Sequence, residues 1–182
     1  MNLTEERKAA LEKTYQYYLH NEDILKMKGI HAHIGSNVYI HTFKVVKGVI
    51  KKAIKYHNDL DLENLLIAAI FHDYYLYDWR KTKDRPHPHG KYHPHIAAVN
   101  AKRDFNIPDR AIEMMETHMW PFNFFKPPKG KEAWILCNVD TWVALVECFI
   151  PKKKKKEKEQ QYLDYISTLF FFLFLLWDEA FN

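Results

Sequence analysis

Residues 65–71, Leu-Leu-Ile-Ala-Ala-Ile-Phe, form an uninterrupted apolar stretch that is followed at once by His72 and Asp73. Asp61 is placed to cap a helix through this stretch, with acidic and amide side chains in its first turn. Because such a helix is apolar nearly all round, it must lie at the centre of the fold, covered by other helices. The sequence therefore predicts an imidazole and a carboxylate at the end of a buried helix.

Apolar residues at helical spacing, or helix start and stop signals, occur along the rest of the chain. They predict further helices over residues 4–20, 37–56, 93–105, 108–118, 132–149 and 160–179. Pro94 falls in the first turn of the helix from 93, where proline is tolerated. Residues 81–92 are basic and rich in proline and histidine, which indicates a loop. With only five glycines in 182 residues, the fold class is predicted to be all-α, a single compact domain of about six to seven helices.

The excess of positive charge is local, because five of the lysines run from Lys152 to Lys156. A charge run of this kind is typical of a solvated connection, so no nucleic-acid polymer is expected as a partner. The apolar residues 169–177 would be about 14 Å long as a helix, against about 30 Å of bilayer hydrocarbon. We expect no membrane span. A last helix that packs on the core or joins two copies in a homo-oligomer is favoured over contact with a membrane surface.

Cys137 and Cys148 are separated by three turns of one predicted helix, too far for a disulfide between them. The start of the sequence is charged and has no apolar core of a signal peptide. Reduced thiols and this start predict a cytoplasmic location.

Four more polar residues fall where burial is predicted. His41 lies among valines on a helix, His93 is expected to begin a helix, His118 to end one, and Asp140 stands mid-helix between apolar residues. Burying a charge without a partner is costly. A shared divalent metal ion would satisfy carboxylates and imidazole lone pairs together.

The order of these residues is more specific than the His-Asp pair, which chance can produce among eleven histidines. The segments that carry these residues are, in order, His41-Thr-Phe-Lys-Val-Val, the stretch 65–73, His93-Pro-His-Ile-Ala-Ala98, Glu116-Thr-His-Met119 and Asn138-Val-Asp-Thr141. In this order the chain resembles the HD-domain superfamily of metal-dependent phosphohydrolases, over about residues 30–148. The resemblance divides the chain into an N-terminal helix and lead-in (1–29), an HD-type core (30–150), and a lysine-rich connection with an apolar C-terminal helix (151–182), all within one domain.

The resemblance implies the metal ligands. His41, His72, Asp73 and Asp140 correspond to the core ligands, and His72 and Asp73 also to the catalytic pair. His93 and His118 correspond to the extra histidines of members that bind a second metal, with Asp73 as the bridge. His93 is preferred over His95 as the ligand because His-Pro-x-Ile is the family's sequence motif at the start of that helix. The expected cofactor is one or two divalent transition metals, Mn, Fe, Ni, Co or Zn.

The chain departs from the family pattern at two places. Many family phosphohydrolases continue His-Asp with Ile-Gly-Lys, whereas this chain has Tyr74-Tyr75-Leu76 and lacks that lysine. The candidates for holding phosphate instead are Arg80, Lys83, Arg85 and His89, with an exposed, non-functional loop as the alternative. Thr117 stands where the cyclic-di-GMP branch has the first histidine of a pair, which argues against that substrate.

The resemblance implies a metal-dependent phosphohydrolase, a phosphomonoesterase or phosphodiesterase, that acts on a nucleotide or other small phosphate ester through a metal-activated water. Two alternatives remain. One is an HD-type di-iron oxygenase, which uses the same order of six ligands. The other is a domain that binds a metal or a nucleotide without catalysis.

Overall fold

The computed structural model describes residues 5–32, 36–56, 60–82 and 88–149. These residues form seven α-helices and one short 3-10 helix, together with a single isolated bridge between His31 and Asn37. The helices are α1 (Glu5–Leu19), α2 (Glu22–Leu25), η1 (Lys26–Gly29), α3 (Val38–Tyr56), α4 (Leu62–Phe71), α5 (His89–Phe105), α6 (Asp109–Thr117) and α7 (Lys131–Phe149). The predicted all-α class is confirmed. The lysine run and the predicted helix 160–179 lie outside the described residues, and no described helix is long and apolar enough to cross a bilayer.

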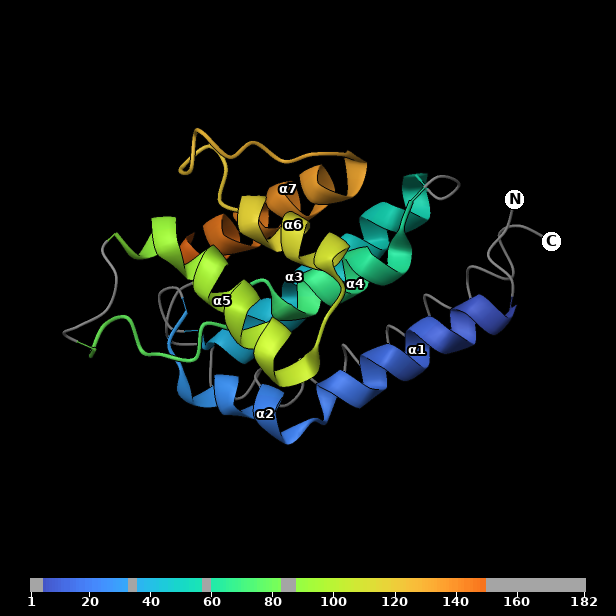
Figure 1. Ribbon diagram of the computed structural model, residues 1–182, viewed down its shortest axis with the longest axis horizontal. Coiled ribbons are helices and arrows are strands. Elements are labelled where there is room, and N and C mark those ends of the chain that lie inside the picture. The colour runs from blue at the N-terminus through green and yellow to red at the C-terminus, as the bar shows by residue number, and fades with distance from the viewer. Residues whose placement is uncertain (1–4, 33–35, 57–59, 83–87, 150–182) are drawn as a thin grey trace.

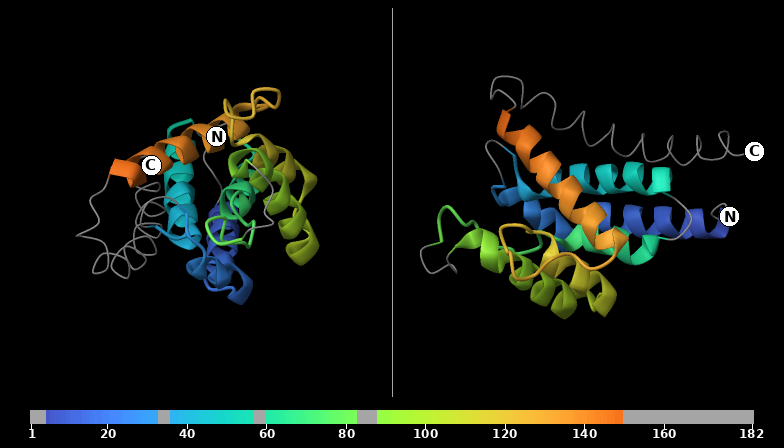
Figure 2. Two further views of the ribbon diagram at one scale, coloured as in Figure 1. Left: turned by 90° about the vertical axis from the view of Figure 1, so that its left-hand side faces the viewer. Right: turned by 90° about the horizontal axis from the view of Figure 1, so that it is seen from above.

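The helices surround a central pair, α3 and α4, which pack against each other (Figure 1). On one side α7 packs against both of them, crossing obliquely in the right-hand view of Figure 2. α6 packs between α4 and α5, and α1 lies along the side of α4 away from α7. The three helices that carry His41, His72 and Asp140 therefore meet in the middle of the molecule.

The central position of α4 follows from its sequence. Seven of its ten residues are buried, and α4 packs against α1, α3, α5, α6 and α7. The predicted cap is confirmed, because the Asp61 carboxylate accepts a hydrogen bond from the Asn64 backbone N–H at 3.3 Å. The helix ends at Phe71, with His72 as its C-cap. The end of α4 thus projects His72 and Asp73 into the centre of the fold.

The predicted start of α5 is wrong by one turn. The helix begins at His89, so His93 is one turn inside it and Pro94 stands in its interior. A proline there removes one intrahelical hydrogen bond, the one that the carbonyl of Gly90 would accept. Pro94 and His93 are both buried. The packing of this turn against the core outweighs the local preference that the prediction relied on.

The prediction also missed α2 and η1, which lie between the predicted helices 4–20 and 37–56. Asn21 caps α2, and its side-chain oxygen accepts hydrogen bonds from the backbone N–H groups of Asp23 and Ile24. The two short helices bury Ile24 and Met27 completely. Segments of four residues are too short to show a periodic apolar pattern, so the asparagine cap is the signal that could have revealed them.

Gly48 sets the distance between α3 and α7. A Cβ atom added to Gly48 would lie 2.6 Å from the Cγ1 atom of Val139, the residue that precedes Asp140. Valine is stiff in a helix and cannot turn away easily. The glycine therefore lets α7 approach α3 closely enough for Asp140 to reach His41.

We expect Gly48→Ala to destabilise the protein, although alanine favours a helix by about 1 kcal/mol over glycine. Overpacking a core contact of this kind costs about 1 to 3 kcal/mol, which exceeds the gain. Urea unfolding of the variant measures the difference. The double variant Gly48→Ala with Val139→Ala should recover part of the lost stability, because it removes the methyl group in conflict. An unfolding free energy equal to or above that of the wild type would contradict the close packing.

Candidate metal centre

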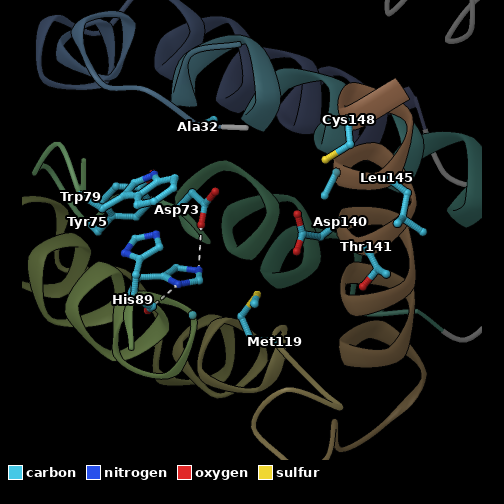
Figure 3. Close-up of a pocket in the computed structure, with 13 residues that line it drawn as sticks. Ala32, Asp73, Tyr75, Trp79, His89, Met119, Asp140, Thr141, Leu145 and Cys148 are labelled. Atoms are coloured by element: carbon cyan, nitrogen blue, oxygen red, sulfur yellow. Dashed lines mark hydrogen bonds and ion pairs between the residues drawn. The ribbon is translucent and has the colours of Figure 1, made fainter. Parts of the chain in front are cut away.

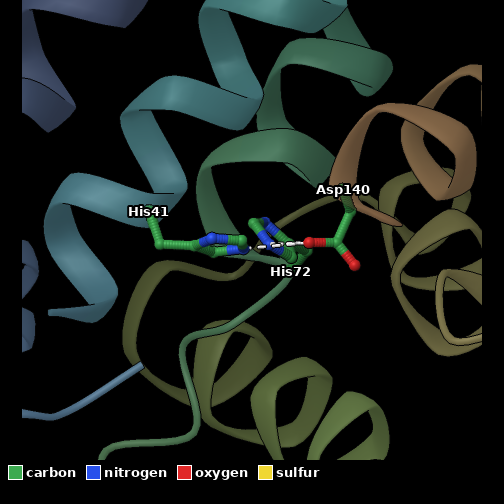
Figure 4. Close-up of side chains that lie close together, drawn as sticks. All are labelled: His41, His72 and Asp140. Carbon is green, nitrogen blue, oxygen red and sulfur yellow. Dashed lines mark hydrogen bonds and ion pairs between the residues drawn. The ribbon is translucent and has the colours of Figure 1, made fainter. Parts of the chain in front are cut away.

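The six predicted metal ligands lie in two adjacent groups in the centre of the molecule. His41 from α3, His72 from the end of α4 and Asp140 from α7 form the first group (Figure 4). Asp73, His93 from α5 and His118 from the end of α6 form the second. Within each group, one ligand atom from every residue lies within 4.8 Å of the others. All six residues are buried.

Asp73 connects the two groups. Its Oδ1 atom lies 3.1 Å from Nε2 of His93 and 3.9 Å from Nε2 of His118. Its Oδ2 atom lies 3.7 Å from Nε2 of His41 and 3.7 Å from Nε2 of His72. One carboxylate oxygen therefore faces each group, the arrangement that a carboxylate bridging two ions requires.

The distances within the groups suit shared coordination. Two ligand atoms that are each about 2.1 Å from one ion and about 90° to 109° apart are separated by about 3.0 to 3.4 Å. Nε2 of His93 lies 3.1 Å from Nε2 of His118, and Nε2 of His41 lies 2.9 Å from Oδ1 of Asp140. Two separations exceed this range: 3.6 Å between Nε2 of His72 and Oδ1 of Asp140, and 3.9 Å between Nε2 of His118 and Oδ1 of Asp73. The residues thus fit divalent ions with small side-chain adjustments.

The backbone fixes the orientation of three of the histidines. The Nδ1 atoms of His72, His93 and His118 lie 2.8, 3.1 and 2.6 Å from the carbonyl oxygens of Ala69, His89 and Met115. A carbonyl oxygen only accepts, so each Nδ1 atom carries the proton and donates it. In the neutral ring the lone pair is then on Nε2, which points into the site. This is the usual preparation of a histidine that binds a metal.

His72 and the pair His93–His118 show the need for a cation most directly. Nε2 of His72 is buried and has no hydrogen-bond partner among the described residues. The Nε2 atoms of His93 and His118 face each other with both of their protons held on Nδ1, so two lone pairs oppose each other when the rings are neutral. A buried polar atom without a partner is costly. A positive ion between these nitrogen atoms removes the cost.

The charges in the site point the same way. Among the described residues, all ion-pair partners of Asp73 and Asp140 are histidines. Burial alone would raise the pKa of Asp73, but the neighbouring imidazoles hold it well below its usual range. Burial lowers the pKa of His118 to about 4, so this ring is neutral at pH 7. A histidine binds a metal as the neutral ring, so in the metal-bound state a divalent ion would balance the charge of the two buried carboxylates.

Glu147 is the residue of this centre that sequence reasoning missed. It is buried, and its Oε2 atom lies 3.1 Å from Nδ1 of His41. Its Oε1 atom accepts hydrogen bonds from Lys44 at 2.6 Å and from Ser36 at 3.0 Å. Glu147 follows Asp140 by seven residues on α7, and that spacing puts both on one face of the helix. The seven-residue spacing is the sequence signal from which Glu147 could have been identified. Glu147 orients His41 as a carboxylate behind a metal-binding histidine does.

A pocket of about 280 Å³ opens onto the centre (Figure 3). Asp73, His93 and Asp140 form part of its wall, so ions held there would be accessible to a small molecule. The other lining residues are largely aromatic or apolar: Ala32, Tyr75, Trp79, His89, Gly90, Met119, Thr141, Ala144, Leu145 and Cys148. Lysine and arginine are absent from the described lining.

The predicted phosphate-binding residues differ in their position. His89 lines the pocket, where its ring stacks on those of Trp79 and His93. Arg80 is exposed at the rim, with its guanidinium 5.1 Å from the Trp79 ring centre and 3.4 Å from the carbonyl oxygen of Ala32. Lys83 and Arg85 lie outside the described residues. His95, rejected as a ligand in favour of His93, points outward and pairs with Glu116 at 2.7 Å.

Metal binding is expected to release protons. Burial alone would lower the pKa of His41, but hydrogen bonds with Asp140 and Glu147 raise it to about 10 in the metal-free protein. The protonated ring stabilises the metal-free fold fully below the unfolded pKa of 6.5, and this stabilisation is lost as the pH rises through about 10. A metal ion competes with this proton. Its affinity should therefore rise with pH across that window.

Calorimetric titration of the metal-free protein with Zn²⁺ or Mn²⁺ at pH 7, in buffers of different ionisation enthalpy, measures the released protons. Metal binding to His41→Ala should release fewer protons than metal binding to the wild type. Metal binding to His95→Ala, which changes a residue on the outside, should release as many. A heat of binding that is the same in every buffer would contradict the protonated His41.

The chain matches no family model, no curated protein and no solved structure. The resemblance to HD-domain proteins therefore rests on the order of the six residues and on their convergence. A buried histidine–aspartate cluster able to hold metal ions is the conclusion that these observations carry.

Proposed function

We propose that the protein is a metal-dependent phosphohydrolase that acts on a nucleotide or another small phosphate ester. The observation that carries the proposal is Asp73, whose two oxygens face two histidine-rich groups at the wall of a pocket. Divalent ions held there would supply a hydroxide nucleophile near neutral pH and stabilise charge on phosphoryl oxygens.

The residues of the chain would bind and orient the substrate. The aromatic side chains of Tyr75 and Trp79 offer flat surfaces for the part of the substrate that carries no phosphate. The Tyr77 hydroxyl lies 2.8 Å from Nδ1 of His89. When Tyr77 donates this hydrogen bond, the neutral His89 ring carries its proton on Nε2 and can donate it to a phosphoryl oxygen. Arg80 at the rim would attract the anionic group to the pocket.

The test is a substrate screen of protein purified without chelator, with its metal content measured in parallel. Phosphomonoesters and phosphodiesters, nucleotides among them, are offered with Mn²⁺, Fe²⁺, Co²⁺, Ni²⁺ and Zn²⁺. Phosphate release that depends on the metal and disappears in Asp73→Asn supports the proposal. Metal-loaded protein that binds a nucleotide but turns over no phosphate ester would instead indicate a non-catalytic domain.

One observation favours a second candidate, a di-iron oxygenase. Apart from the candidate metal ligands, the described pocket wall is largely apolar or aromatic and carries no lysine or arginine, although a phosphate group usually pairs with such cations. Six ligands with a central carboxylate also suit two irons. Anaerobic purification, followed by iron analysis and measurement of oxygen consumption with candidate substrates, separates the two reactions. Oxygen consumption by the iron-loaded protein without phosphate release would decide for the oxygenase.

A further inference from the structure

The connection between α6 and α7 displays an unusual set of aromatic side chains at the surface. Phe122, Phe124 and Phe125 are 61%, 70% and 95% exposed. Trp120, at the start of the connection, contacts Trp134 on α7 with ring centres 5.0 Å apart, and Trp134 is 36% exposed. Exposed apolar residues that occur singly are ordinary, but three exposed phenylalanines within four residues, two of them with ring centres 5.7 Å apart, mark a contact surface.

Internal hydrogen bonds hold this connection, residues 120–131, in shape. The Asn123 backbone N–H donates to the Met119 carbonyl at 3.0 Å, and the Lys126 N–H donates to the Asn123 carbonyl at 2.9 Å. The Asn123 side chain donates to the carbonyl of Lys91 on α5 at 3.2 Å. The connection forms the upper edge of the molecule in Figure 1. The phenylalanines are therefore presented by a structured turn.

The charge on this surface is positive. Residues 120–131 contain Lys126, Lys129 and Lys131 and no acidic residue. All three lysines are exposed. Lys126 pairs with Glu116 on α6 at 3.5 Å, and Glu116 also pairs with His95. Exposed aromatic rings thus stand beside a group of cations.

We propose that residues 120–131 form an aromatic and basic loop that docks on an anionic lipid surface. Aromatic side chains favour the boundary between headgroups and acyl chains, and lysines beside them reach anionic headgroups with their flexible stems. Each lysine near such a surface adds attraction that salt weakens. Contact surfaces between proteins are instead enriched in arginine and depleted in lysine. The composition of the loop favours the lipid.

The loop is also connected to the pocket. A Cβ atom added to Gly90, which lines the pocket, would lie 3.1 Å from Cε1 of Phe122 and 3.4 Å from Cε of Met119. The inner part of the loop therefore packs against the pocket wall, while Phe124 and Phe125 point to solvent. Docking would hold this side of the pocket next to the lipid surface. The proposal itself does not depend on the reaction that the pocket performs.

The test is co-sedimentation of the full-length protein with vesicles of phosphatidylcholine, with and without phosphatidylserine. Wild type should bind the vesicles that contain phosphatidylserine, and binding should weaken as salt rises. The triple variant Phe122→Ser, Phe124→Ser, Phe125→Ser should bind at least about tenfold more weakly, since withdrawing even one phenylalanine ring from an apolar environment has an effect of that order. Lys126→Gln, Lys129→Gln, Lys131→Gln should cause a loss of about tenfold or more at low salt.

Control variants elsewhere on the surface test the effect of losing exposed apolar side chains and of losing charge. Tyr17→Ser with Val99→Ser removes exposed apolar side chains elsewhere, and Lys13→Gln, Lys51→Gln, Lys52→Gln removes three exposed lysines outside the loop. Both should bind nearly as wild type, and all variants should keep the circular dichroism and unfolding temperature of the wild type. The Phe125→Trp variant places a tryptophan in the loop. Vesicles whose lipids are brominated in the acyl chain should therefore quench a larger share of its tryptophan fluorescence than of that of the wild type.

Three results would overturn the proposal. The first is wild-type protein that binds neither kind of vesicle. The second is binding that the loop variants leave unchanged, which would assign it to another part of the chain. The third is an oligomer in solution that the phenylalanine variant dissociates, which would make the loop a contact between copies.

Discussion

Asp73→Asn should remove metal from both groups and abolish the proposed activity. Asp73 is the residue whose oxygens face both groups, at 3.1 Å from His93 and 3.7 Å from His41. Asparagine keeps the shape but carries no charge, so it cannot balance or bridge two ions. Changing a residue that only orients a metal ligand typically lowers metal affinity or activity about 10- to 100-fold. Loss of a bridging ligand should therefore lower both the metal affinity and the activity by more than about 100-fold.

The measurement is metal content per chain, together with affinity by competition with a chelating dye. Asp78→Asn is the matched control, because Asp78 also pairs with a histidine, His31 at 3.0 Å, but outside the centre. It should keep wild-type metal content. His118→Ala separates the two groups: if the wild type binds two ions, this variant should keep one. Asp73→Asn protein that retains all of its metal would show that Asp73 is not a ligand.

The sequence was sufficient for the fold class and for the convergence of the six residues. The apolar stretch 65–71 required a central helix, and that helix ends at the centre of the fold as expected. The ordered histidines and aspartates on the other helices then had one common interior to face. The apolar periodicity of a helix, and the cost of burying a charged side chain on it, can be read from that helix alone. Both could therefore be assessed before the packing of the helices was known.

Features that depend on contacts between helices were not predictable in this way. The start of α5 was misplaced because Pro94 follows the local rule for a first turn, whereas packing extends the helix back to His89. The pocket combines Trp79 and Tyr75 from the segment after α4 with residues of α5 and α7. No local pattern marks such an assembly. Glu147 was missed because a glutamate near the end of a helix is ordinarily solvated.

Glu147→Ala should lower both the stability of the protein and its affinity for metal. The carboxylate is 1% exposed and accepts from Lys44 at 2.6 Å and from Ser36 at 3.0 Å, and it holds Nδ1 of His41 at 3.1 Å. Burial alone would raise its pKa, but His41 and Lys44 lower it to about 2. Removing one partner of a buried ion pair costs about 3 to 5 kcal/mol, because the other charge remains buried.

Urea unfolding in the presence of a chelator measures the stability term, and calorimetric titration with Zn²⁺ measures the affinity, which should fall about 10- to 100-fold. Glu113→Ala, which removes an exposed carboxylate paired with Arg110, should change the unfolding free energy by less than about 0.5 kcal/mol.

The double variant Glu147→Gln with Lys44→Met distinguishes the two roles of Glu147. It removes the charge of Lys44 together with that of Glu147, so stability should return toward that of the wild type. The affinity for metal should remain low, because glutamine cannot hold His41 as a carboxylate does. If the affinity returns together with the stability, Glu147 supports the fold and has no role in orienting His41.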